Sequence, residues 1–311
     1  MDVSPLFVLL LVVGVAAGGA ALLMRQFVHA EASAEQRARR HAHLISGAAV
    51  VIGLLAALAA AVAVLLPAPM DSAVGRPGVA AMMLPLAFGV AHTGVLLVGE
   101  LTWPRPAGLV RRAQLRHRGV LQTAPVWLLR TGAGTAVTGI VVIAVGAVTG
   151  DRYSRSITVY AGAGSVQGSA SPYVGPGYGL PALVGLGCLL AVTAAALWVV
   201  ANRPAVVTDD AEQDDAFRRA SAHRVLRGAT SAGLVLVAGL VAVSGLAVRN
   251  AALAAAENAR LADLPVGTAA TLLPWVGGAL AFLGLLGGAA GVGIVVVRTT
   301  GRMVEPVRAD R

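Results

Sequence analysis

The chain lacks lysine and has few of the side chains that catalysis usually needs. All 24 basic residues are arginine, only 13% of the 311 residues are charged, and aromatic residues make up 4%. The single cysteine, Cys188, excludes an intrachain disulfide and any cysteine pair for a metal or redox site. HExxH, GxSxG and Walker A motifs are absent, as is a GxGxxG between a strand and a helix. The best-known metalloprotease, hydrolase and nucleotide-binding motifs are therefore excluded.

The chain does have long apolar runs. Hydrophobic residues make up 57% of it, and the mean hydropathy is +0.78, which leaves too little polar surface for a soluble globule. A bilayer core of about 30 Å needs roughly 20 apolar residues in a helix. Seven such runs predict an all-α, polytopic helix bundle with transmembrane spans at about 5–24, 44–66, 79–99, 131–150, 180–201, 229–248 and 271–297.

The arginines predict how the bundle is oriented. Nineteen of the 24 lie in four alternate segments, 25–43, 100–130, 202–228 and 298–311. Because cytoplasmic loops retain positive charge, we expect a multi-pass protein of the bacterial inner membrane with its N-terminus outside and its C-terminal tail, 298–311, in the cytoplasm. Asp2 stands where a signal peptide is positive, so the first run is expected to be a true span. These juxtamembrane clusters account for the pI of about 11.2, and no nucleic acid is expected as a partner.

Tryptophan and glycine add predictions about the helix surfaces. Indole rings favour the headgroup level, and four tryptophans fall near predicted helix ends. We expect interface anchors at the cytoplasmic side from Trp103, Trp127 and Trp198, and at the outer side from Trp275. GxxxG pairs, which let helices approach closely, occur at 14–18, 284–288 and 287–291.

The loops differ in composition. The outer loop 151–179 is rich in Gly and Ser and holds all four tyrosines, Tyr153, Tyr160, Tyr173 and Tyr178. Within it, 156–160 has the content of a short strand. Two interpretations stay open, a loop that contacts a partner and a flap packed over the helix ends. The segment 249–270 is predicted to form a short helix on the membrane surface.

The acidic run "TDDAEQDDAFRR" at 208–219 predicts the start of a helix. Asp209 and Glu212 resemble a capping box, and acidic residues suit the positive end of a helix dipole. We expect this helix to continue unbroken from about 210 into the sixth span. A divalent-cation site is the alternative, but the EF-hand spacing is absent, so no metal is expected.

His92, beside Thr93, is the one ionisable residue deep within the predicted spans. Such residues often mark function, for example as a proton relay or a haem or metal ligand. The other interpretation is a neutral imidazole that is hydrogen-bonded to a neighbouring helix. Glu100 lies about 12 Å further along the helix and is too far to pair with it. No second intramembrane histidine is present for a haem, so no cofactor is expected.

The string "GELTWPRPAGLVRRAQLRHR", residues 99–118, resembles integral membrane proteins of Streptomyces and related actinobacteria, a group that brings no known activity with it. The lack of lysine is in keeping with such a high-GC source. Within this string, Glu100 is expected to mark the membrane edge and Trp103 to lie at headgroup depth. The prolines end the helix, and Arg105 is expected to face lipid phosphates.

Together these features favour a single membrane domain, 1–311, that acts as a non-catalytic accessory or scaffold protein. The loop 151–179 would contact a membrane or extracytoplasmic protein.

The alternative is a small-molecule permease or the membrane subunit of a transporter, with His92 near its path. Three strings, each with paired arginines followed by histidine, begin at 38, 110 and 217 and could indicate an internal repeat. Positive-inside bias at helix entrances is the favoured explanation, because the spacing from each proline to its arginine pair differs. A third hypothesis is an enzyme that acts on lipid-linked substrates through Glu100, Arg105 and His117.

Overall fold

The computed structural model describes residues 34–65, 77–104, 123–151, 155–162, 166–205 and 211–296. The elements are α2 (Ala34–Leu65), α3 (Pro77–Leu101), α4 (Val126–Thr149), β1 (Ile157–Tyr160), β2 (Gln167–Ala170), α5 (Pro176–Asn202), α6 (Ala211–Leu261) and α7 (Thr268–Val296). Each of the six helices is long and apolar enough to cross a bilayer. The predicted all-α bundle is confirmed, and six of the seven predicted spans fall on these helices. The span 5–24 and the tail 298–311 lie outside the described residues.

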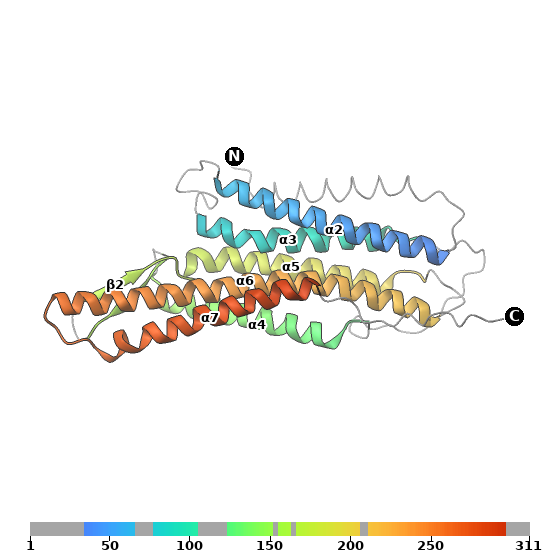
Figure 1. The fold of residues 1–311 in the computed structure, drawn as a ribbon. Coiled ribbons are helices and arrows are strands. Elements are labelled where there is room, and N and C mark those ends of the chain that lie inside the picture. Colours follow the sequence, from blue (N-terminus) through green and yellow to red (C-terminus); the bar gives the residue numbers. More distant parts are fainter. Residues whose placement is uncertain are drawn as a thin grey trace.

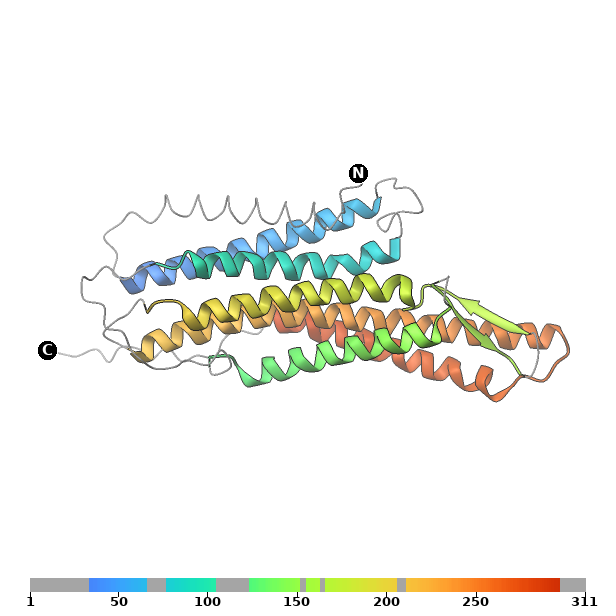
Figure 2. The ribbon, with the colours of Figure 1, turned by 180° about the vertical axis from the view of Figure 1, so that it is seen from behind.

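The helices lie side by side along one long axis (Figures 1 and 2). α6 is the central element, because it packs against α3, α4, α5, α7 and both strands, whereas α2 packs on α3. One end of the bundle carries the first turns of α2 and α6 and the last turns of α3 and α5, and we call it the arginine end. The opposite end carries the two strands, the last turns of α6 and the first turns of α7, and we call it the hairpin end.

α6 is 51 residues long, which corresponds to about 76 Å at 1.5 Å per residue. The prediction of an unbroken helix into the sixth span is confirmed. Arg227 and Arg249 bracket a stretch without charge that is about 33 Å long, close to the thickness of a bilayer core. The remaining turns extend beyond this stretch at both ends. A membrane-crossing α6 would therefore project from the bilayer on both sides.

The prediction of a separate surface helix in 249–270 is wrong, because residues 249–261 continue α6. Alanine dominates this segment and has the highest intrinsic helix propensity, so nothing in it stops the helix. The helix ends where Asp263 adopts a left-handed conformation, with φ of 53°. The Leu264 amide then donates to the carbonyl of Ala259, which satisfies one carbonyl of the last turn.

The two strands form an antiparallel hairpin that packs on the end of α6. Residue 157 pairs with 170, and residue 160 pairs with 167, so the predicted strand at 156–160 is confirmed. The α6 face beneath consists of alanines, with Ala251, Ala252, Ala255 and Ala259 all buried. Gly168 approaches this face so closely that a Cβ there would overlap the backbone of Ala251 and Ala255. The hairpin and the end of α6 therefore form one packed unit.

α7 packs lengthwise against α6 through glycines that recur every seven residues, at positions 277, 284 and 291. A Cβ on Gly284 would lie 2.6 Å from the backbone nitrogen of Ala242. Of the predicted GxxxG pairs, Gly284 and Gly291 make the close approaches, whereas a Cβ on Gly288 would come only to 3.9 Å of Ala238. The pair 14–18 lies outside the described residues.

We expect Gly284→Val to lower the free energy of unfolding by about 2 kcal/mol more than Gly293→Val. Both substitutions add the same side chain to α7, but Gly293 has no neighbour within 4 Å of the added Cβ. Thermal or denaturant unfolding of the purified protein in detergent measures the difference. Equal costs for the two variants would contradict the packing described for α6 and α7.

Candidate functional site at the arginine end

His92 lies on α3, buried between helices. Its ring stacks on Phe88 with centroids 5.4 Å apart, and it rests against Gly228 of α6. The Nδ1 atom of His92 and the hydroxyl of the fully buried Thr93 have no hydrogen-bond partner. A cavity of about 260 Å³ lies between α4, α5 and α6, but its lining is almost entirely apolar and does not include His92. His92 therefore faces packed side chains and not this cavity.

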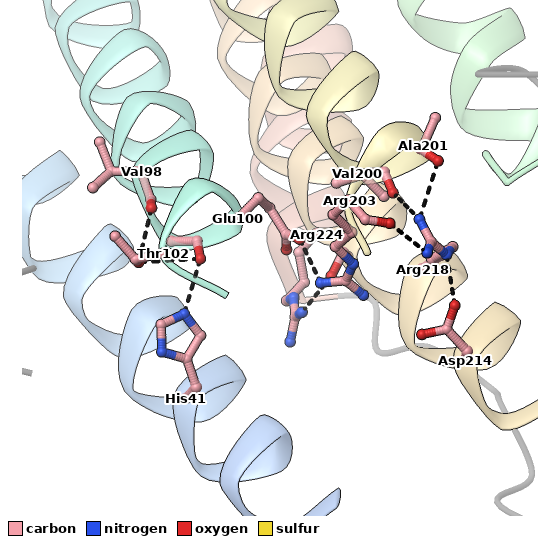
Figure 3. Close-up of polar contacts among 12 residues, drawn as sticks. His41, Val98, Glu100, Thr102, Val200, Ala201, Arg203, Asp214, Arg218 and Arg224 are labelled. Carbon is pink, nitrogen blue, oxygen red and sulfur yellow. Dashed lines mark hydrogen bonds and ion pairs between the residues drawn. The ribbon is translucent and has the colours of Figure 1, made fainter. Parts of the chain in front are cut away.

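The described residues bring buried charges together at the arginine end, and we call this group the arginine cluster (Figure 3). Its charged members are Glu100 on α3, Arg203 just after α5, and Asp214, Arg218 and Arg224 on α6. Arg203 donates from Nη1 to the Glu100 carboxylate at 2.6 Å. The two side chains are only 2% and 6% exposed. Since a buried charge is costly unless it is paired, this contact joins the ends of α3 and α5 firmly.

Trp103 forms the aromatic part of the cluster. The Arg203 guanidinium stacks over its ring, 3.7 Å from the centroid, and Phe217 meets it at an angle, with centroids 6.4 Å apart. His41 of α2 approaches the same ring edge-on at 5.4 Å and shares a hydrogen bond of 2.9 Å with the carbonyl of Gly99. The indole links α2, α3 and α6 around Arg203. The Trp103 side chain is only 7% exposed. It is therefore packed inside the cluster, whereas the sequence predicts an anchor at the membrane interface.

Arg218 closes the end of α5. Its Nε donates to Asp214 at 2.8 Å, one turn earlier on α6. Nη1 donates to the carbonyls of Val200 and Ala201, and Nη2 donates to the carbonyl of Arg203. The last carbonyls of a helix have no partner within it, and a cation suits the negative end of its dipole. Arg218 therefore acts as a buried cap that fixes α5 to α6.

Arg224 is the more accessible arginine of the cluster. It is partly buried, and Nη2 donates to the hydroxyl of Ser221 at 3.0 Å. Glu100 lies near both Arg203 and Arg224, as Figure 3 shows. Burial lowers the pKa of Arg203 to about 10, and Glu100 partly offsets this shift, so its guanidinium stays charged at neutral pH. The cluster therefore contains three arginine side chains and two carboxylates, which leaves one positive charge in excess.

The remaining predicted tryptophans and the predicted tyrosines lie outside the arginine cluster. Trp127, Trp198 and Trp275 are 45%, 62% and 77% exposed, as an anchor requires. Of the four tyrosines, Tyr173 is buried and hydrogen-bonded to Thr149 at 2.6 Å, and Tyr178 packs under Arg155. Tyr160 is 57% exposed, whereas Tyr153, like Arg105 and His117, lies outside the described residues. Two of the three described tyrosines, Tyr173 and Tyr178, therefore take part in packing, and Tyr160 is available for surface contact.

No group of three or more His, Cys, Asp or Glu side chains in the described part of the chain is arranged to hold a metal ion. The sequence predicts Glu100 at the membrane edge, or as part of an enzyme site with Arg105 and His117, and it places Asp214 in the acidic run that begins a helix. Neither of their partners is predicted: Arg203 counts only toward the positive segment 202–228, and Arg218 is placed on the helix that begins near 210. The i, i+4 spacing of Asp214 and Arg218 was the one local signal available.

Comparison of the chain with models of protein families, with curated proteins and with solved structures finds no match.

Proposed function

We propose that the chain is a non-catalytic scaffold or accessory protein of the bacterial inner membrane, with the hairpin end outside the cell membrane and the arginine end in the cytoplasm. The arginine distribution supports this orientation, since most of the arginines in the described residues lie toward the arginine end. The observation that carries the proposal is the hairpin packed on the end of α6. This unit, which we call the head, comprises residues 155–162, 166–170 and 250–274.

The head offers a surface suited to a protein partner. Beyond Arg249, α6 continues for about 18 Å, which carries the head clear of the bilayer core. Apolar side chains stay exposed there, with Tyr160 at 57%, Leu261 at 77% and Leu264 at 49%. Exposed aromatic and leucine side chains outside the lipid commonly mark protein contacts. The partner would be an extracytoplasmic protein or the outer part of another membrane protein.

The arrangement of charge also favours a structural role over transport. In the described residues, Glu100 and Asp214 bind arginines of the cluster, and the apolar cavity does not reach His92. A permease needs a polar path through the bundle. The described residues therefore give the permease hypothesis less support than the scaffold hypothesis.

Photo-crosslinking from the head tests the proposal. A photoreactive residue in place of Leu261 is expected to crosslink one protein of defined mass in intact cells, and Gly168→Val should reduce this product at least tenfold because the hairpin must leave α6. Gly162→Val is the matched control, since its Cβ would meet only the Pro265 carbonyl, at 3.8 Å. The same photoreactive residue in place of Val148, an exposed residue of α4, controls for position.

Two results would contradict the proposal. The first is a Leu261 crosslinking pattern identical to that from Val148, which would mean that the head selects no partner. The second is full crosslinking in Gly168→Val, which would mean that the packed head is not what the partner recognises. A substrate flux in proteoliposomes that His92→Ala removes would favour the permease instead.

A further inference from the structure

The arginine cluster contains more hydrogen-bond donors than acceptors. Arg203 uses Nη1 for Glu100, but its Nε and Nη2 have no partner although the side chain is only 2% exposed. The indole Nε1 of Trp103, in contact with Arg203, is also buried without a partner. Buried polar groups are hydrogen-bonded in nearly all folded proteins, and charged donors most of all. The Nε and Nη2 atoms of Arg203 and the Nε1 atom of Trp103 are therefore donors that lack an acceptor.

The charge balance points the same way. Among the described residues of the cluster, Arg203, Arg218 and Arg224 carry three positive charges against the two carboxylates of Glu100 and Asp214. Arg218 is fully used by Asp214 and the end of α5, so the excess falls on Arg203 and Arg224. In the described part of the chain, Arg224 donates to the neutral hydroxyl of Ser221 and lies near the Glu100 carboxylate, which already accepts a hydrogen bond from Arg203. An anion at this point would balance the charge and accept the open hydrogen bonds.

We propose that the arginine cluster binds one phosphate group, which accepts hydrogen bonds from Arg203, Arg224 and the indole of Trp103. Planar guanidinium groups match phosphate geometry, and stacking on Trp103 holds Arg203 in a fixed orientation. Arg224 is partly buried and provides the approach from solvent or from the headgroup layer. The cluster follows directly on the apolar part of α5, so a phospholipid headgroup and a free phosphate are both within its reach.

This site lies at the opposite end of the bundle from the head, so it does not depend on the proposed function. Thermal unfolding of the purified full-length protein in detergent tests it with three additives, namely short-chain phosphatidylglycerol, phosphatidylcholine with the same chains, and inorganic phosphate. Phosphatidylglycerol or inorganic phosphate is expected to raise the unfolding temperature in a saturable way. Phosphatidylcholine is expected to have a clearly smaller effect, because the choline cation balances the charge of its phosphate. An effect of phosphatidylglycerol alone identifies a lipid headgroup, and an effect of inorganic phosphate identifies the free anion.

Two variants locate the effect. Arg224→Gln is expected to weaken the apparent affinity about tenfold, because it removes one charge-assisted contact. Trp103→Phe keeps the aromatic stack under Arg203 but removes the N–H group, and it should weaken binding severalfold. Arg130→Gln, at an exposed arginine of α4, is the control and should leave binding unchanged. No response to phosphatidylglycerol or to inorganic phosphate, equal responses to both lipids, or an equal loss in Arg130→Gln and Arg224→Gln would overturn the proposal.

Discussion

Replacing Arg218 with methionine is expected to lower the free energy of unfolding by about 3–5 kcal/mol, among the largest effects of any single substitution in the described helices. Methionine keeps much of the volume but leaves Asp214 without its buried cation. It also removes the donors for three carbonyls at the end of α5. Each such loss inside the protein costs more than an exposed contact does, because water does not replace it.

Denaturant unfolding in mixed micelles, followed by tryptophan fluorescence, measures this cost. Arg219→Met, at the next residue of the same helix, is the matched control, since Arg219 is exposed and should change stability by less than about 0.5 kcal/mol. Arg218→Lys keeps the charge but not the planar fork of donors, so we expect it to recover less than half of the loss. A cost below about 1 kcal/mol for Arg218→Met would show that it does not cap α5.

The second large effect is expected from the contact between Glu100 and Arg203. Glu100→Leu leaves the Arg203 charge buried without its carboxylate and should cost about 3 kcal/mol. The double variant Glu100→Leu with Arg203→Leu should cost clearly less than the two single costs added together, because neither charge is then left alone. A coupling of about 2 kcal/mol between the two positions is the expected result of the double-mutant cycle.

The exposed pair of Glu35 and Arg39 on α2 provides the matched comparison. Their side chains are 34% and 45% exposed and lie one turn apart, so the same cycle should give only about 0.3–0.5 kcal/mol. Similar couplings for the two pairs would contradict the burial of the first. Both cycles use the same micelles and salt concentration, because salt screens the exposed pair more strongly.

The helices could be predicted from sequence because each depends on a local property. A run of about 20 apolar residues is sufficient to identify a span, and alternate loops reveal the arginine asymmetry. The short strand at 156–160 was recognisable from its β-branched and aromatic residues. The continuation of α6 beyond Arg249 was missed because an alanine-rich segment is equally compatible with a surface helix and with an extended span. The alanine face of this segment packs against the β-hairpin, a contact that the local sequence does not reveal.

The arginine cluster was not predictable in this way. Glu100 and Arg203 are 103 positions apart, and nothing in either local sequence identifies the other as its partner. Trp103 and Glu100 were read as features of a membrane edge, a position that many tryptophans and acids occupy. Their burial follows from the way α2, α5 and α6 converge on the end of α3, which is a tertiary property. The i, i+4 spacing of Asp214 and Arg218 indicates their pairing, but nothing in the local sequence indicates that Arg218 also binds the carbonyls at the end of α5.

The placement of the two ends of α6 on opposite sides of the membrane is the central claim, and cysteine labelling tests it most directly. In a Cys188→Ala background, Glu257→Cys in the head and Arg219→Cys near the arginine cluster provide two exposed positions on the same helix. A membrane-impermeant maleimide applied to intact spheroplasts is expected to label the Glu257→Cys protein and to label Arg219→Cys only after lysis. Labelling of Arg219→Cys before lysis, or of both positions equally, would contradict the account.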